Sequence, residues 1–229
     1  LFEAYLKEAD CATQHRTLCK QAGQRNAAAL GDVIGLQHWS QRLLKIDQLA
    51  SYLDHPYYPT ARAKSGFDDA ALERYAPEFA PRFELNWLAI PKQAMTLTSV
   101  QPLHWPGFEE VGLPGTLHNS HSLLPVHPLT WAVLEQYGLP EGALKAPHTA
   151  MQVEPTLSVR TVVCIDQPHW HIKLPLLVTT LGARNLRLIK PSTLYDGHWF
   201  ETTLQALARR DPELGSRYLH VDEQHGGHV

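Results

Sequence analysis

The chain has 229 residues, of which 44% are hydrophobic and 19% are charged. This composition is typical of a globular protein with a packed core, and it excludes an intrinsically disordered chain. The net charge of −3 gives no electrostatic reason to expect nucleic acid or a membrane surface as a partner, and no apolar run of about 18 residues predicts a membrane span. The 3 cysteines lack CxxC spacing, so the sequence favours a reducing, cytoplasmic setting over a disulfide framework.

Two amphipathic helices are predicted at the start of the chain. Apolar side chains recur at helical spacing through residues 1–22, and Gly23 is expected to end that helix. A second helix is predicted over residues 32–53, with Asp32 as its N-cap. The apolar stripe expected to face the core consists of Val33, Leu36, Trp39, Leu43, Leu44, Ile46, Leu49 and Leu53. Residues 1–53 are therefore expected to form a helical N-terminal segment.

An ordered loop and a short helix are predicted next. Residues 54–67 contain Pro and Gly residues that cannot continue a helix. This loop carries His55, Arg62 and Lys64, the first cluster of side chains suited to binding an anion. The acidic pair at 68–69 then predicts the capped start of a short helix.

Strands dominate the predictions after that helix. Residues 82–90 and 93–100 alternate in polarity, which predicts a β-hairpin. Residues 123–138 predict a short strand that turns at His127 into a helix, and Gly138 is expected to end that helix.

Near the end of the chain, residues 186–190 predict a further strand. An amphipathic helix is predicted over residues 197–211, with Phe200, Leu204 and Leu207 directed inward. The closing sequence EQHGGHV gives no structural signal.

The predicted fold class follows from the order of these elements. Helices come first and β-hairpins follow without βαβ alternation, which predicts an α+β fold with a largely antiparallel sheet and flanking helices over residues 54–229. The sequence contains neither GxxxxGK[ST] nor GxGxxG, so it supports no P-loop or Rossmann nucleotide site. If the protein binds a phosphate, side chains must therefore hold it.

Residues 155–184 are the most informative stretch. They predict two strands joined by a turn at residues 166–169. On the second strand, alternation places four apolar residues on one face: Ile172, Leu174, Leu176 and Val178. Ser158, Arg160 and Lys173 are then expected to project together from the hairpin, with Arg184 just beyond. Hydroxyl groups and cations on one sheet face indicate an anion site.

Several segments together resemble a known enzyme family. HPYYPTARAKSGF (55–67), YAPEF (75–79), LLPVHPLTW (123–131), PTLSVRT (155–161) with HIKLPL, and TTLGAR (179–184) occur in order. They resemble the motifs of siderophore synthetases that work without a peptide-synthetase assembly line, of the aerobactin-synthetase (IucA/IucC) type. The resemblance covers roughly residues 50–190 and rests on the combination of motifs, since each is weak alone.

The resemblance implies an ATP- and Mg²⁺-dependent, AMP-forming ligase. Such enzymes adenylate a carboxylate, usually of citrate or a related polycarboxylate, and an amine or alcohol then attacks to form an amide or ester. Homodimers are common among these proteins, and no metal site formed by protein side chains is implied.

The resemblance also assigns roles to individual residues. ATP phosphates would contact His55, Ser158, Arg160, Thr161 and Lys173. The carboxylate would contact Thr179, Thr180 and Arg184, and the catalytic cations would be Arg160, Lys173 and Arg184.

Two segments depart from the family pattern. In the loop, Tyr58 stands where the family has a second His, and Arg62 and Lys64 occupy the Lys and Arg positions. The segment 179–184 has Leu181-Gly182 in place of the usual Ser after the second Thr. The family members are also about twice as long or longer, and this chain starts inside a helical pattern without Met. The chain is therefore expected to be the N-terminal part of a larger, multi-subdomain synthetase and to be inactive alone.

Other interpretations of the same residues remain open. Ser158, Arg160 and Lys173 are also typical of the solvated face of a half-buried hairpin. The same basic face would equally suit a non-catalytic module that binds a nucleotide or a polycarboxylate. The 14 histidines raise a third alternative, a metal-binding protein, although their pairs lack helical i,i+4 spacing.

Overall fold

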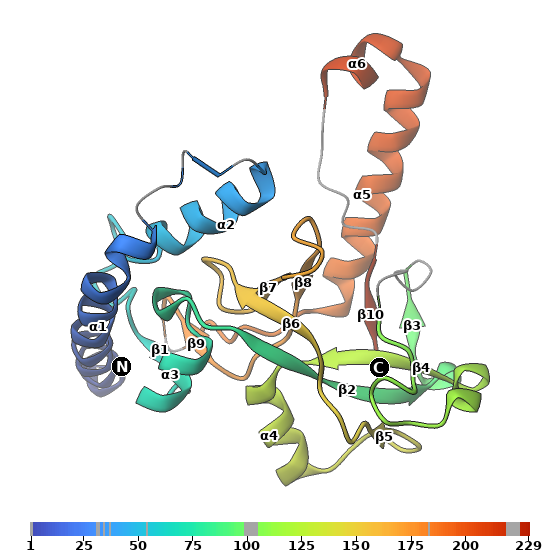
Figure 1. The fold of residues 1–229 in the computed structure, drawn as a ribbon, viewed down its shortest axis with the longest axis horizontal. Helices are drawn as coiled ribbons and strands as arrows, with labels where there is room; N and C mark the ends of the chain where they lie inside the picture. The colour runs from blue at the N-terminus through green and yellow to red at the C-terminus, as the bar shows by residue number, and fades with distance from the viewer. Residues whose placement is uncertain are drawn as a thin grey trace. The chain divides into compact units, whose positions relative to one another are not determined.

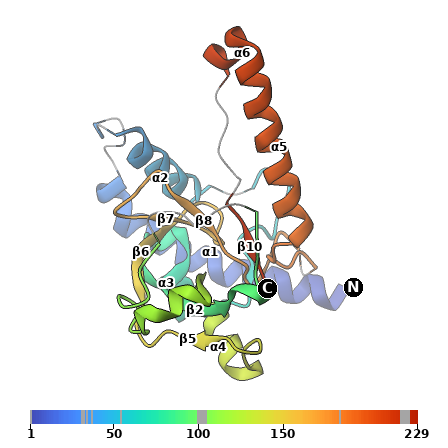
Figure 2. The same ribbon diagram turned by 90° about the vertical axis from the view of Figure 1, so that its right-hand side faces the viewer.

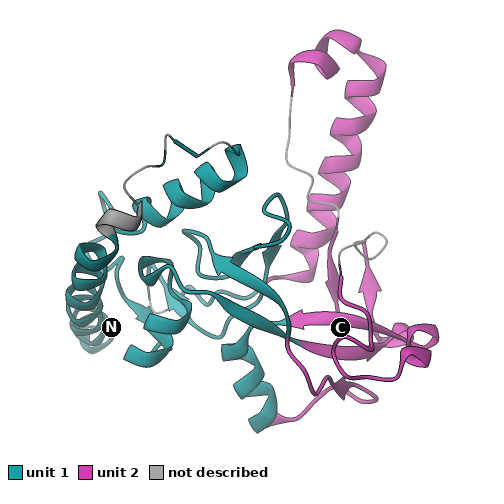
Figure 3. Ribbon diagram, viewed as in Figure 1, with its two compact units in different colours: residues 1–86, 126–136, 150–188 teal, residues 87–125, 137–149, 189–229 magenta. Residues whose placement is uncertain are grey.

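The structure is a computed structural model that describes residues 2–30, 33, 35–36, 38–53, 55–98, 105–182, 184–218 and 225–229, without the side chains of 27–30. The chain forms two compact units (Figure 3). The first unit comprises residues 1–86, 126–136 and 150–188, and the second comprises residues 87–125, 137–149 and 189–229. The N-terminal helices share the first unit with strands, so the boundary expected at residue 53 does not coincide with a unit boundary.

The first unit combines helices with antiparallel strands (Figure 1). Its helical elements are α1 (Phe2–Leu30), α2 (Trp39–Ala50), α3 (Asp69–Tyr75), the 3-10 turn η1 (Pro77–Phe79) and α4 (Pro128–Tyr137), whose last residue falls in the second unit. Its strands are β1 (Lys64–Ser65), the first part of β2 (Phe83–Pro91), β6 (Ala150–Pro155), β7 (Thr161–Cys164), β8 (His171–Lys173) and β9 (Thr179–Thr180). The order β2-β6-β7-β8 forms an antiparallel sheet, and β1 pairs separately with β9.

The second unit holds the rest of β2 and a long helix. Its elements are η2 (Lys92–Ala94), β3 (Thr96–Leu97), η3 (Gly115–Asn119), β4 (His121–Val126), β5 (Leu144–Lys145), α5 (Pro191–Arg210), α6 (Pro212–Arg217) and β10 (Gly227–His228). β5 pairs antiparallel with β2, and β10 with β3. Within this unit, α5 extends away from β10 and carries α6 at its far end (Figure 2). The predicted α+β class with a largely antiparallel sheet is confirmed.

The first helix is longer than predicted, because Gly23 does not end it. α1 continues to Leu30, and a Cβ atom at Gly23 would lie 3.0 Å from Cδ1 of Tyr52. The Tyr52 hydroxyl in turn donates a hydrogen bond to the carbonyl oxygen of Glu78. The glycine therefore allows a tyrosine ring to pack directly against the helix backbone.

The second helix corrects the sequence prediction in two ways. α2 begins at Trp39, whereas the predicted cap Asp32 lies outside the described residues. The stripe expected to face the core is largely exposed, with 64% of Trp39 and 75% of Leu53 accessible. The buried residue of α2 is Gln48, whose side-chain amide donates to Oε2 of Glu154 in β6 (3.1 Å). A polar contact to β6 thus orients this helix.

The hairpin predicted over residues 82–100 is wrong. β2 pairs with β6 in the first unit and with β5 in the second, while β3 pairs with β10. The 3-10 turn η2 follows β2 directly, and the Lys92 N–H donates to the carbonyl oxygen of Ser120 (2.9 Å). That turn leads the chain away from β2. The closing sequence, for which no structure was predicted, supplies β10.

Predictions for residues 186–211 are also corrected. Residues 186–190 form no strand, and Leu186 makes only an isolated bridge with Thr179. α5 exposes 57% of Phe200 and 45% of Leu207, and its buried residue is Glu201. Helical periodicity identified the helix here and assigned the wrong side to the interior.

Other local predictions are confirmed. Asp68 caps α3 by accepting a hydrogen bond from the Ala71 N–H (2.7 Å). His127 holds the turn into α4, because its Nδ1 accepts from the Leu129 N–H (3.1 Å). Gly138 follows α4 with a φ of +93°, a conformation that favours glycine. None of the described helices is long and apolar enough to cross a membrane.

Candidate anion-binding site

The hairpin β7–β8 forms the rigid part of the candidate site. Its turn lies where the sequence placed it, and the Trp170 N–H donates to the carbonyl oxygen of Gln167 (2.8 Å). Thr161 pairs with Lys173 across the two strands. Because directly paired residues project from the same face of a sheet, the structure brings this hydroxyl and this cation together.

Burial along residues 172–178 follows the predicted alternation, although the second strand, β8, ends at Lys173. Four apolar residues are buried in turn: Ile172, Leu174, Leu176 and Val178. The residues between them, including Lys173, are exposed. Leu176 and Val178 belong to the core of the first unit together with Phe67 and Leu72. Lys173 is therefore the last residue of β8, and the segment that follows it is anchored in the core.

The first strand corrects the prediction for Ser158 and Arg160. β7 begins only at Thr161, and both residues lie in the turn that connects it to β6. The Thr161 N–H donates to the carbonyl oxygen of Ser158 (2.7 Å), and the Ser158 N–H donates to the Thr156 hydroxyl (3.3 Å). These bonds close the chain into a tight turn, so strand alternation does not apply to Ser158 and Arg160.

Arg160 reaches from this turn to a segment beyond β9. Its Nη1 donates to the carbonyl oxygen of Leu188 (2.7 Å), and its own carbonyl oxygen accepts from the Leu174 N–H (2.7 Å). Burial, and secondarily the charge of Arg187, lower the pKa of Arg160 from its usual value. Within the described residues, the Nε atoms of Arg160 and Arg187 are buried without a hydrogen-bond partner.

The predicted carboxylate residues lie around β9. Thr179 and Thr180 are half-buried and pair with Ser65 and Lys64 of β1. Arg184 follows in an exposed turn. Among the described side chains, no hydrogen bond or ion pair joins Arg184 to the other candidate residues.

His55 is exposed at the start of the loop. Its Nδ1 accepts hydrogen bonds from the N–H groups of Tyr57 (3.2 Å) and Tyr58 (3.1 Å). In the neutral ring the proton is then on Nε2, which makes that nitrogen a donor. A donor suits a phosphate oxygen, although no described contact links His55 to the hairpin.

Arg62 and Lys64 are not available for an anion, contrary to the prediction for this loop. Both are buried and form ion pairs with Glu78, which Lys64 contacts through Nζ and Arg62 through Nη1 (3.5 Å). Arg62 also donates to the carbonyl oxygen of Ser51. The two cations therefore stabilise the packing of the loop against η1.

Tyr58 has a structural contact on each side. Its hydroxyl donates to Oε1 of Glu8 in α1 (3.2 Å). A Cβ atom at Gly182 would lie 2.9 Å from the same hydroxyl oxygen, and Gly182 has a φ of +116°. The loop thus contacts both the first helix and the turn after β9.

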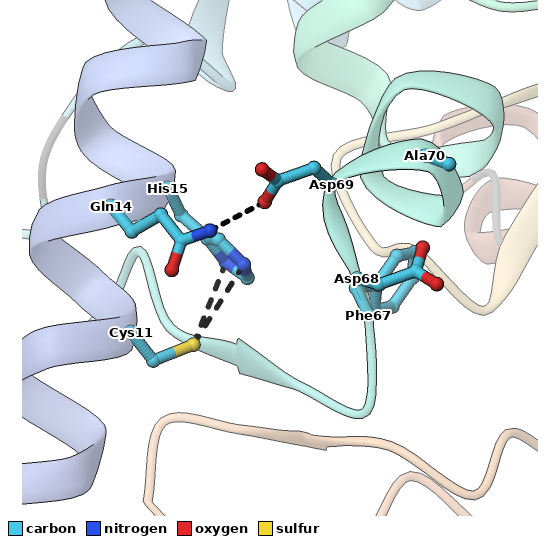
Figure 4. A pocket seen from close by; sticks show the side chains of 7 residues that line it. All are labelled: Cys11, Gln14, His15, Phe67, Asp68, Asp69 and Ala70. Atoms are coloured by element: carbon cyan, nitrogen blue, oxygen red, sulfur yellow. Dashed lines mark hydrogen bonds between the residues drawn. The ribbon is translucent and has the colours of Figure 1, made fainter.

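A separate hollow lies between α1 and the start of α3 (Figure 4). Its volume is about 540 Å³, and its lining includes Cys11, Gln14, His15 and Asp69. Gln14 donates to Asp69 (2.6 Å), and burial raises the pKa of the Cys11 thiol and lowers that of His15. A protonated thiol is a poor nucleophile. The residues that line the hollow include no Lys or Arg, so the hollow does not suit phosphate.

Sequence reasoning missed Arg187. The segment was interpreted as a strand, although Arg187 is its polar residue between Leu186 and Leu188. That position, close after the TTLGAR motif, was the available signal. Among the described residues, no group of three or more His, Cys, Asp or Glu side chains could hold a metal ion.

Comparisons with known proteins agree on one family. The profile described as the IucA / IucC family matches residues 42–229. Two curated relatives match over short stretches. The L-2,3-diaminopropanoate–citrate ligase of Staphylococcus aureus (strain NCTC 8325 / PS 47) is 38% identical over 56 residues, which is 24% of this chain and 10% of that protein. The aerobactin synthase of Escherichia coli is 42% identical over 53 residues, which is 23% of this chain and 9% of that protein.

Solved structures show the same fold. Aerobactin synthetase IucC from a hypervirulent pathotype of Klebsiella pneumoniae matches with a TM-score of 0.63 at 24% identity, over 92% of this chain and 40% of that one. ATP-bound aerobactin synthetase IucA from the same source matches with a TM-score of 0.63 at 21% identity, over 92% and 39%. The petrobactin biosynthesis protein AsbB of Bacillus anthracis str. Sterne matches with a TM-score of 0.59 at 20% identity, over 82% and 37%. The chain spans about two fifths of the length of these solved relatives.

Proposed function

Because this chain belongs to the IucA / IucC family, we propose that it is part of an ATP-dependent siderophore synthetase that activates a carboxylate of citrate or a related acid. The curated relatives include a ligase whose name specifies citrate and an aerobactin synthase. One solved relative with the same fold is described as ATP-bound. These similarities support the proposed substrate class, and the residues of this chain support the chemistry.

The observation that carries the proposal is the pairing of Thr161 with Lys173 beside Arg160. A hydroxyl donor and a cation share one face of a hairpin whose continuation is buried in the core, and the guanidinium of Arg160 immediately precedes Thr161 in the chain. Donors held rigidly before the substrate arrives stabilise charge that develops on a phosphate without further reorganisation. This set fits a polyphosphate.

In the proposed reaction, a carboxylate oxygen attacks the α-phosphorus of ATP, pyrophosphate leaves, and an amine or alcohol then displaces AMP from the acyl carbon with loss of a proton. Lys173 would act as a compact charge against the phosphates, and Arg160 as a planar donor. His55 would donate from Nε2. Thr179, Thr180 and Arg184 would hold the carboxylate, since hydroxyls and guanidinium both donate to carboxylate oxygens.

Mg²⁺ fits this site only through the phosphates. The candidate residues include no carboxylate, and Mg²⁺ commonly binds through substrate phosphates together with few protein ligands. When bound with the nucleotide, the ion would reduce the negative charge of the phosphates.

A calorimetric titration of the chain with MgATP tests the proposal. We expect saturable binding that weakens about 10-fold or more in Lys173→Ala and in Arg160→Ala, because each variant removes a charge-assisted hydrogen bond. Lys145→Ala, an exposed lysine of the second unit, is the matched control and should bind like the wild type. Absence of binding by the wild type, or equal binding by all variants, would contradict the site.

A non-catalytic binding module is the second candidate. The chain covers about two fifths of the solved relatives, and this partial coverage favours binding without catalysis for the chain in isolation. Such a module would bind MgATP without releasing AMP or pyrophosphate.

A further inference from the structure

A second arginine, Arg187, lies in the segment that the side chain of Arg160 contacts. Arg160 lies in the turn between β6 and β7, and Arg187 lies in the segment after β9. Both are half-buried, and the charge of Arg187 contributes to the lowered pKa of Arg160. The Arg160 side chain also donates to the carbonyl oxygen of Leu188, the neighbour of Arg187 (2.7 Å).

The backbone fixes Arg187 at this place. Its N–H donates to the carbonyl oxygen of Val178 (3.0 Å), and its carbonyl oxygen accepts from the Leu176 N–H (3.0 Å). Leu176 and Val178 are both buried in the core of the first unit. Arg187 therefore starts from a rigid position, as Arg160 does from its tight turn.

This arrangement is unfavourable when nothing is bound. Two positive charges repel each other, and the repulsion is stronger where burial reduces screening by water. Within the part of the chain that the structure describes, the Nε–H groups of both arginines are buried without an acceptor, and a buried unsatisfied donor is destabilising. In the described part of the chain, the ion pairs of the buried carboxylates Glu78 and Glu154 go to Arg62, Lys64 and Arg82 instead.

We propose that Arg160 and Arg187 form a two-arginine clamp for the polyphosphate of the nucleotide, which makes Arg187 a further binding residue of the site. An anion between the two guanidiniums removes their repulsion and supplies the missing acceptors. The triphosphate carries several negative charges and offers oxygen atoms to two forks at once. The clamp rests on the proposed function, because it extends the set of residues that hold ATP.

The test compares ligand binding and stability in four proteins of the same length: the wild type, Arg187→Gln, Arg187→Lys and the control Arg210→Gln. Arg210 is exposed at the end of α5 and lies outside the candidate site. Each protein is titrated with MgATP, with inorganic pyrophosphate and with citrate, and its thermal unfolding is followed with and without MgATP.

We expect Arg187→Gln to weaken binding of MgATP and pyrophosphate by about 10- to 100-fold and to leave citrate binding unchanged. Arg187→Lys should recover part of the affinity, because it restores the charge without the fork. In the absence of ligand, Arg187→Gln should unfold at the same or a higher temperature than the wild type, because the repulsion is gone. A purely structural arginine would instead lower that temperature.

The outcomes separate the clamp from the function on which it rests. If the wild type binds MgATP and Arg187→Gln binds equally well, the clamp is wrong and the proposed function stands. If Arg187→Gln weakens citrate binding and not MgATP binding, the assignment to phosphate is overturned. If the wild type binds neither MgATP nor pyrophosphate, both the proposed function of this chain and the clamp fail.

Discussion

At the scale of single residues, burial decides which charges are available to a ligand. Arg62 and Lys64 are conspicuous cations in the sequence, and the structure uses both against the buried Glu78. Breaking a buried ion pair leaves an uncompensated charge, so such cations are held in place by their partner. Arg187 shows the opposite case, because the sequence does not single it out and its Nε has no acceptor among the described residues. A list of basic residues therefore cannot identify an anion site.

His127 leads to a prediction about acid stability. Burial lowers the pKa of this histidine to about 3, against about 6.5 in the unfolded chain. Below about pH 6.5 the histidine of the unfolded chain binds a proton, whereas that of the folded chain stays neutral. The contribution of His127 to stability is therefore complete above pH 6.5. It is lost as the pH falls from about 6.5 towards 3, at up to about 1.4 kcal/mol per pH unit.

His127→Asn tests this linkage. The variant keeps an acceptor for the Leu129 N–H and cannot titrate in this range. At pH 7 the free energy of unfolding of the variant should be lower than that of the wild type, because the smaller side chain leaves a cavity. In urea unfolding experiments, the difference between the two free energies should become smaller as the pH falls to 4. His15 and His171 also have lowered pKa values and are present in both proteins, so their effect cancels. Parallel stability curves for the two proteins would contradict the prediction.

At the scale of elements, periodicity located helices more reliably than it assigned their faces. The start of α3, the turn into α4 and the β7–β8 turn were predicted because local residues determine them: a cap, a proline and a turn sequence. The buried sides of α2 and α5 were wrong because their buried residues are polar, Gln48 and Glu201. The pairing of β3 with β10 joins residues far apart in the sequence, which no local pattern encodes.

The residues of the candidate site also differ in how well the sequence predicted their positions. The turn between β7 and β8 follows from the sequence, but strand alternation that places Arg160 on the face of Lys173 places Thr161 on the opposite face, so the observed pairing of Thr161 with Lys173 corrects the prediction. The positions of Ser158 and Arg160 depend on hydrogen bonds of the β6–β7 turn, and alternation misplaced them. The place of Arg187 near Arg160 depends on the hydrogen bond from Arg160 to the carbonyl oxygen of Leu188, a contact between distant residues that local patterns do not encode.

The exposed stripe of α2 leads to a prediction about association. Trp39, Leu43 and Ile46 are 64%, 48% and 50% exposed, and contiguous apolar surface of this kind favours association or aggregation. We expect the chain to self-associate as its concentration rises, and Leu43→Glu to reduce this in sedimentation velocity. The free energy of unfolding of this variant should change by about 0.5 kcal/mol or less, because the substituted residue is on the surface. Gln41→Glu adds the same charge to an exposed polar position of α2 and should leave the association unchanged.

At the scale of the whole molecule, the first unit holds every candidate site residue that the sequence identified, and it also holds Arg187. A binding face and a complete active site are different things, because catalysis also requires the second substrate to be positioned against the first. The chain covers about two fifths of the solved relatives, so binding and turnover are expected to separate.

That separation is measurable with hydroxylamine as a substitute nucleophile. With MgATP and citrate, we expect the 229-residue chain to form no hydroxamate and to release no AMP above background. A protein of the same family with the length of the solved relatives should do both under identical conditions and serves as the positive control. Hydroxamate formation by the present chain, abolished by Lys173→Ala, would show that the expected inactivity is wrong.

Tyr58 lies close to Gly182, the neighbour of Leu181, so the two segments that depart from the family pattern lie against each other. The loop has tyrosine where the pattern has histidine, and the segment after β9 has Leu181-Gly182 where the pattern has serine. A side chain at 182 would meet the Tyr58 hydroxyl at 2.9 Å and would be strained at a φ of +116°. A side chain at position 182 is therefore incompatible with Tyr58 in its present place. Across relatives, tyrosine at the first position should co-occur with glycine at the second, and a sequence that gained one without the other would have to shift its loop.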